Sequence, residues 1–152
     1  MPKSRMTITI DPAAHAAMSM RQENMSEAIS VSLDRYLTLI ARAQRALDKA
    51  LSAEEKGLIL DALNGVHLGG PHAAMFALVT IRDCLADGYD GKWGVDADAL
   101  TEKLDEFTPL DQIALVDAAE IWWAAVARGE APEPTSMFAL ALPQRQSMMR
   151  PE

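Results

Sequence analysis

The first residues of the chain alternate between apolar and polar side chains. The apolar positions are Met6, Ile8 and Ile10, and the polar positions are Arg5, Thr7 and Thr9. Alternation with a period of two predicts a half-buried β-strand. A strand must pair its backbone donors and acceptors, and no second strand is evident in the rest of the sequence. We therefore expect an antiparallel two-stranded ribbon, formed with the same strand of a second copy across a two-fold axis.

Two helices are predicted directly after the strand. Asp11-Pro12 is a typical helix start, and a short Ala-rich helix is expected over about residues 13–22. Asn24 and Glu27 have the spacing of a capping box, which predicts the start of a second, longer helix. Its apolar residues recur with helical spacing, and the pattern meets no breaker before Ser52. These residues are Ile29, Leu33, Tyr36, Leu37 and Ile40.

The order of strand, short helix and capped amphipathic helix resembles the ribbon-helix-helix proteins, of the CopG-like and Arc/MetJ class. The resemblance rests on residues 5–10 (RMTITI) and residues 29–36 (ISVSLDRY), and it covers about the first 45 residues. The sequence departs from the family pattern at Gln22-Glu23, where the family has a glycine in the turn, and its first helix is about one turn shorter. The resemblance implies an intertwined dimer that binds DNA.

The polar face of the ribbon offers groups that suit DNA recognition. A two-stranded ribbon fits the major groove, where Arg can donate two hydrogen bonds to guanine and Thr can contact base edges. An exposed edge strand rich in Thr, a good strand former, is the structural alternative. The family resemblance favours DNA binding. It implies that bases are read by Arg5, Thr7 and Thr9.

The start of the second helix is the expected phosphate site. Free amides and the helix dipole favour anions there. The residues expected to hold phosphate are Lys3, Asn24, Met25 and Ser26. A segment of this size buries too little surface alone, so a homodimer is expected, with a palindromic or repeated DNA site. The predicted dimer core consists of Ile8, Ile10, Ile29, Leu33, Tyr36 and Leu37.

The second part of the chain predicts a bundle of about four helices. Helix starts are indicated at Ser52, Pro71, Asp96 and Thr108, and helix ends at Gly65, Gly88, about Glu106 and Gly129. In the second of these helices, the side chains expected to face the core are Met75, Leu78, Val79 and Leu85, with Phe76 beside them. For the adjacent Trp122 and Trp123 two readings stay open: one Trp lies at an interface, or it lies along the domain surface.

The last residues contain four prolines, which break any helix. A loose tail is expected over residues 131–152. The alternative is that the short apolar stretch from Met137 to Leu142 docks on a neighbour as an extended segment.

Charge is distributed unevenly along the chain. Residues 1–50 hold seven Lys or Arg and five Asp or Glu, a balance of +2. Residues 51–152 hold seven Lys or Arg and seventeen Asp or Glu, a balance of −10, and the whole chain carries −8. The N-terminal part can therefore face phosphate, whereas the acidic part is repelled by it.

The sequence offers few candidate residues for metal binding or catalysis. His67, His72 and Cys84 match no standard zinc spacing, so we expect no metal and no cofactor. No catalytic arrangement is recognisable, and an enzyme is not expected. A single cysteine and the lack of a signal peptide or membrane-length apolar run favour a cytoplasmic protein that does not enter membranes.

The sequence thus predicts a mainly α-helical protein with three parts. Residues 1–50 form a ribbon-helix-helix module that dimerises and binds DNA, residues 51–130 an acidic helical domain for oligomerisation or partner binding, and residues 131–152 a Pro-rich flexible tail. The favoured function is that of a sequence-specific transcriptional repressor that regulates its own gene. The alternatives are an antitoxin whose C-terminal part binds a toxin, and an interaction scaffold that does not bind DNA.

Overall fold

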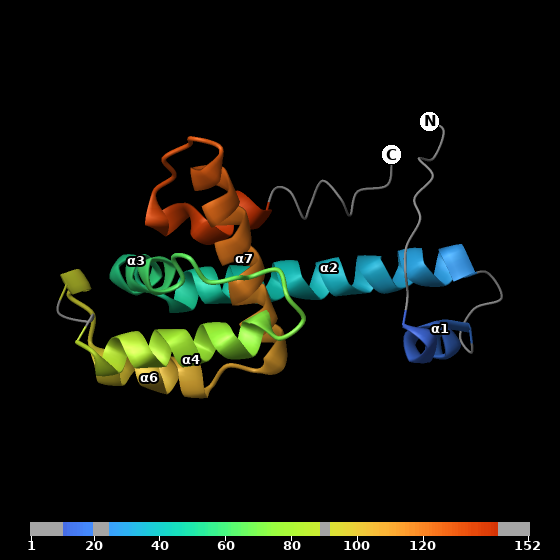
Figure 1. Ribbon diagram of the computed structural model, residues 1–152, viewed down its shortest axis with the longest axis horizontal. Coiled ribbons are helices and arrows are strands. Elements are labelled where there is room, and N and C mark those ends of the chain that lie inside the picture. Colours follow the sequence, from blue (N-terminus) through green and yellow to red (C-terminus); the bar gives the residue numbers. More distant parts are fainter. Residues whose placement is uncertain (1–10, 20–24, 89–91, 143–152) are drawn as a thin grey trace. The chain divides into compact units, whose positions relative to one another are not determined.

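The computed structural model describes residues 11–19, 25–88 and 92–142, and these are mainly helical (Figure 1). The elements are α1 (Pro12–Ser19), α2 (Met25–Ala50), α3 (Ala53–Ala62), α4 (Ala73–Ala86), α6 (Ala97–Asp105), α7 (Pro109–Ala127) and the 3-10 helix η1 (Pro134–Ser136). Residues 137–142 are also helical. The described residues contain no strand, and the predicted ribbon strand, residues 5–10, lies outside them.

The chain divides into two compact units, residues 1–36 and residues 37–152. The division lies within α2, whereas the sequence placed a boundary after residue 50. It lies earlier because the second half of α2 contributes Ile40 and Leu47 to the hydrophobic core of the second unit. The long helix α2 therefore belongs to both units.

The helices of the first unit begin where the sequence predicted. The side-chain oxygen Oδ1 of Asp11 accepts a hydrogen bond from the backbone N–H of Ala13 at 3.0 Å, which caps α1. Helix α2 starts at Met25 and continues without interruption to Ala50. None of the helices in the described part of the chain combines the length and the hydrophobicity that crossing a lipid bilayer requires.

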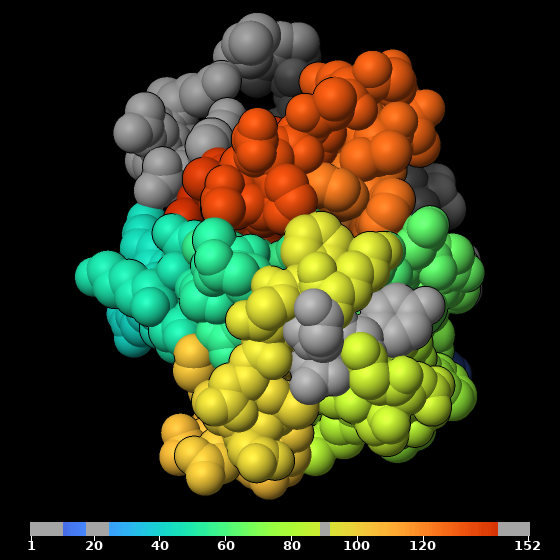
Figure 2. Space-filling view, turned by 90° about the vertical axis from the view of Figure 1, so that its left-hand side faces the viewer, coloured from blue at the N-terminus to red at the C-terminus, as the bar shows by residue number. Residues whose placement is uncertain are grey.

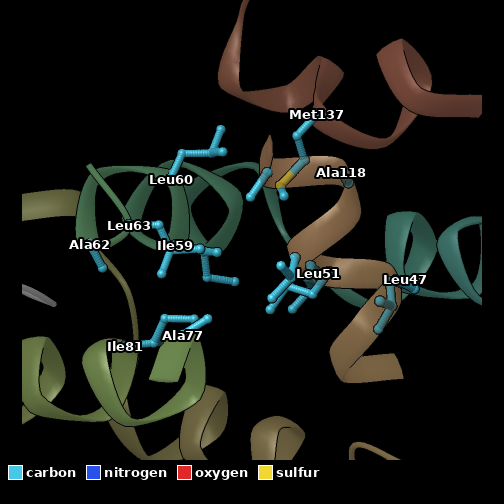
Figure 3. Packing of buried hydrophobic residues seen from close by; sticks show 14 of the residues in the cluster. Leu47, Leu51, Ile59, Leu60, Ala62, Leu63, Ala77, Ile81, Ala118 and Met137 are labelled. Carbon is cyan, nitrogen blue, oxygen red and sulfur yellow. The ribbon is translucent and has the colours of Figure 1, made fainter. Parts of the chain in front are cut away.

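Helix α3 lies at the centre of the second unit. Every residue from Glu55 to Leu60 is buried, so the helix is covered on all sides. Figure 3 shows two of these sides: Leu60 lies toward Met137, and Leu63, just after α3, lies toward Ile81 of α4.

The polar groups of α3 are paired with groups from other elements. Glu55 Oε1 accepts hydrogen bonds from the backbone N–H of Ser52 at 2.8 Å and from Lys103 Nζ of α6 at 2.6 Å. Lys56 Nζ lies 2.6 Å from Asp48 Oδ1 and 5.9 Å from the centre of the Phe138 ring. These contacts allow two charged side chains to stay buried in the middle of an apolar core.

A tryptophan covers α3 at its glycine. A Cβ atom at Gly57 would lie 2.6 Å from Cζ3 of Trp93, so this position has no room for a larger residue while the ring packs there. The indole Nε1 of Trp93 donates to Asp61 Oδ2 at 3.3 Å, and Lys92 Nζ lies 3.0 Å from the same oxygen. Figure 2 shows residues 92–97, in yellow, between α3 in blue-green and α4 in yellow-green.

The adjacent tryptophans of α7 both pack within the chain. Trp122 is 8% exposed and donates to the carbonyl of Glu133 at 3.1 Å. Trp123 is half-buried against the core and donates to the carbonyl of Leu60 at 3.1 Å, near the end of α3, where helical carbonyls lose their backbone partners. The two rings meet edge to face, with centroids 4.9 Å apart. Trp123 therefore holds α7 against α3.

One prediction for the second unit was wrong, and another was right only in part. The tail is not loose over residues 131–142, because η1 and the helix that follows it pack on α3 and bury Met137, Phe138 and Ala141 completely. The stretch docks on its own chain as a helix and not as an extended segment. In α4 the buried face consists of Ala73, Ala77, Ile81 and Leu85. Of the predicted inward residues, Leu85 is buried and Leu78 packs against the core, whereas Met75 and Val79 are exposed, as is Phe76 beside them. Ala73 and Ala77 let the first half of α4 approach the core closely, and Ile81 and Leu85 fill the core along its second half.

We predict that Phe138→Ala lowers the free energy of unfolding by about 3–5 kcal/mol, because it removes a fully buried ring and leaves a cavity. The matched control is Phe76→Ala, which removes the same side chain from a site that is 58% exposed and changes stability by about 0.5 kcal/mol or less. Urea denaturation followed by circular dichroism measures both. Equal losses in the two variants would contradict the packing of residues 137–142.

Candidate functional site

Most of the predicted DNA-contacting residues lie outside the described part of the chain. This holds for the predicted base-reading residues and for several others: Lys3, Arg5, Thr7, Ile8, Thr9, Ile10 and Asn24. The other two predicted phosphate contacts, Met25 and Ser26, form the first turn of α2, where Met25 is half-buried and Ser26 is exposed. The first turn of a helix carries amides without helical partners, and α2 is 26 residues long in all.

The predicted dimer-core residues of α2 differ in burial. Leu37 is buried, at 6% exposed, and Ile29 is half-buried. Leu33 is 51% exposed and Tyr36 is 41% exposed. Residues three and four apart are neighbours on a helix surface, so Ile29, Leu33 and Tyr36 form one stripe. A single chain therefore leaves much of this apolar stripe accessible to water.

A second exposed apolar face lies on α4, and the sequence analysis missed it. Met75 is 57% exposed, Phe76 58% and Val79 50%. We refer to these three side chains as the α4 face. The regular spacing of Ala73, Ala77, Ile81 and Leu85 was the signal that could have revealed it, because α4 has apolar residues on two sides and one core covers one of them.

A hollow adjoins the α4 face. It has a volume of about 310 Å³, at the small end of the range for ligand pockets. Its lining is mostly apolar and shares Phe76 with the face: Val66, His67, Gly70, Pro71, His72, Ala73 and Phe76. Both histidines that the sequence analysis considered as metal ligands lie in this lining. Within the described part of the chain, no group of three or more metal-ligating side chains comes together.

Acidic residues continue the α4 face toward the end of the helix. Asp83 follows Val79 by four residues, Asp87 follows Asp83 by four, and both are exposed. The nearby Arg82 is paired with Asp105 of α6, with Nη2 2.8 Å from Oδ1. The surface of α4 therefore passes from an apolar hollow through exposed apolar side chains to exposed carboxylates.

Cys84 lies on α4 among these carboxylates. Burial raises the pKa of its thiol, and the negative charges of Asp87, Asp61 and Asp83 raise the pKa further. A thiol with a raised pKa stays protonated at neutral pH, and the thiolate is the reactive form. Cys84 is thus a poor nucleophile.

We predict that iodoacetamide alkylates Cys84 slowly at pH 7, and that half-maximal rate is reached at a higher pH in the folded protein than in protein unfolded in urea. Asp87→Asn removes one negative charge, so it should shift the folded-state curve toward lower pH. Mass spectrometry at a series of pH values gives the rates. Folded and unfolded curves with the same midpoint would show that the local charges have no such effect.

Comparison with known proteins adds no relative: no family model matches the chain, and neither a curated protein nor a solved structure matches it.

Proposed function

We propose that the chain is a homodimeric DNA-binding transcriptional regulator, with its N-terminal part acting as a ribbon-helix-helix module and repressing its own gene. The observation that carries the proposal is the exposed apolar stripe of α2. It lies on the helix that the ribbon-helix-helix resemblance assigns to the dimer core, at the positions expected to contact a partner.

The stripe supports dimerisation on energetic grounds. Leu33 and Tyr36 are 51% and 41% exposed, and burying a large apolar side chain fully is worth about 1.5–3 kcal/mol. A symmetric dimer buries each of them twice, once per chain. A second copy would also provide the pairing partner that the strand pattern of residues 5–10 requires.

The DNA contacts follow from the sequence pattern and from the helix start. Arg5, Thr7 and Thr9 share one face of the predicted strand, and a dimer would bring six such side chains to one ribbon. Met25 and Ser26 stand in the first turn of α2, where the positive end of the helix dipole favours an anion such as phosphate. The acidic second unit would avoid the phosphate backbone and leave the N-terminal part to bind it.

We predict that Leu33→Ser weakens dimerisation at least about tenfold, because the loss of its burial in two chains exceeds the roughly 1.4 kcal/mol that a tenfold change represents. Sedimentation velocity over a range of concentrations measures the dissociation constant. The control is Ile113→Ser, which removes an exposed apolar side chain from α7 and should leave the dissociation constant unchanged. A monomeric wild-type protein at micromolar concentration would rule out the dimer.

We predict that the protein binds DNA from upstream of its own gene more tightly than a scrambled duplex, and that the affinity falls as salt rises. Thr7→Ala/Thr9→Ala should lose this selectivity, and Arg5→Ala should lose about 1–3 kcal/mol of binding free energy. Fluorescence anisotropy at low and physiological salt measures both. Arg128→Ala is the control, since it removes the same charge from an exposed ion pair with Glu130 in the second unit.

The same titrations separate the proposal from its alternatives. If wild type binds the upstream and scrambled duplexes equally well, and Arg5→Ala binds each as tightly as wild type, the ribbon does not read bases. A dimer that binds neither duplex would instead indicate that the N-terminal part serves dimerisation alone.

A further inference from the structure

We propose that the α4 face (Met75, Phe76 and Val79) and the hollow beside it bind a basic amphipathic segment of a partner protein. This inference concerns the second unit and does not depend on DNA binding by the first. It rests on three observations: an exposed apolar surface, a hollow that continues it, and acidic side chains at its far end.

The apolar part of the surface is continuous. Phe76 and Val79 are three residues apart on α4 and therefore lie side by side, and Met75 adjoins them. Each of the three is at least half exposed. Phe76 also lines the hollow of about 310 Å³, which is large enough to receive one bulky side chain. Contiguous apolar surface next to a hollow is typical of sites that bind an anchoring residue of a partner.

The charges near the face select a basic partner. Asp83 and Asp87 are exposed, and among the described residues neither forms an ion pair. The nearest cation on the helix, Arg82, is already engaged by Asp105. The pKa of Cys84 is consistent with this negative charge. Burial is the largest cause of its rise, and the charges of Asp87, Asp61 and Asp83 raise it further. A Lys or Arg placed at this end would meet two carboxylates.

The spacing defines the partner segment further. Phe76 and Asp83 are seven residues apart, which is about 10 Å along the axis of α4. A partner helix would bridge this distance between residues i and i+7, with an apolar anchor at one end and a basic residue two turns away. An extended segment would bridge it with about three residues.

A second copy of this chain fits the face poorly. In a symmetric pair the same surface lies on both sides, so Asp83 and Asp87 of one copy would meet only the carboxylates or the apolar side chains of the other α4 face, and no basic residue. The protein also carries a net charge of −8, which opposes association of acidic surfaces. A basic partner removes this repulsion.

The test uses the full-length protein and a fluorescein-labelled, 14-residue amphipathic peptide made of Leu and Lys, with a Leu and Glu peptide of the same pattern for comparison. Fluorescence anisotropy measures binding to wild type, to Phe76→Ser/Val79→Ser and to Asp83→Asn/Asp87→Asn. Two matched controls change equivalent side chains elsewhere: Ile113→Ser for exposed apolar surface, and Glu102→Gln/Glu120→Gln for two exposed acids. Circular dichroism verifies that every variant is folded.

The proposal expects the Lys peptide to bind wild type, the Glu peptide to bind at least tenfold more weakly, and each α4 variant to lose about tenfold in affinity while both controls retain it. Equal affinity of the α4 variants and the controls would reduce the binding to general charge attraction and overturn the proposal. No binding of the Lys peptide to wild type would overturn it as well. Self-association that disappears in Phe76→Ser/Val79→Ser, without any loss of peptide binding, would assign the face to a second copy.

Discussion

The second unit depends on the burial of the middle of α3, where every residue from Glu55 to Leu60 is buried. In a helical segment that is buried on every side, the side-chain polar groups must be paired with groups from other elements, because water cannot reach them. Here Glu55 accepts a hydrogen bond from Lys103 of α6, and Lys56 donates one to Asp48 of α2. The carbonyl of Leu60 accepts one from Trp123 of α7. Each of these hydrogen bonds also fixes the neighbour that supplies it. The position of the surrounding helices is thus set by polar pairing with α3 as well as by apolar packing.

This arrangement explains why the exposed apolar side chains lie where they do. Each neighbour of α3 packs one side on the core, and α4 does so with Ala73, Ala77, Ile81 and Leu85. Met75, Phe76 and Val79 are then left on the outer side. On α2 the core of the second unit takes Ile40 and Leu47, and Leu33 lies outside it. Both surfaces consist of apolar side chains of the kind found in protein cores, and a single chain leaves them exposed.

Local signals in the sequence predicted the helix boundaries well. The capping box at Ser52 and Glu55 and the one at Thr108 and Asp111 are both present, as is the cap at Asp96, because a cap depends on residues within one turn. The inward face of α4 was not predictable in this way, since two apolar stripes compete and the choice depends on what packs against the helix. Burial of residues 137–142 likewise depends on contacts with α3, which no local pattern encodes. The ribbon, the dimer and DNA binding stay predictions from the first 45 residues.

The packing of residues 137–142 on α3 has a consequence for how the chain folds during synthesis. Phe138 closes over Lys56, a residue translated more than eighty positions earlier. At a translation rate of about 5–20 residues per second, several seconds pass between the two. Throughout that interval α3 has no cover on this side, and its apolar residues stay open to other nascent chains and to chaperones. The second unit is therefore completed only after residues 137–142 have been synthesised, well after the helices α2 and α3 on which it is built.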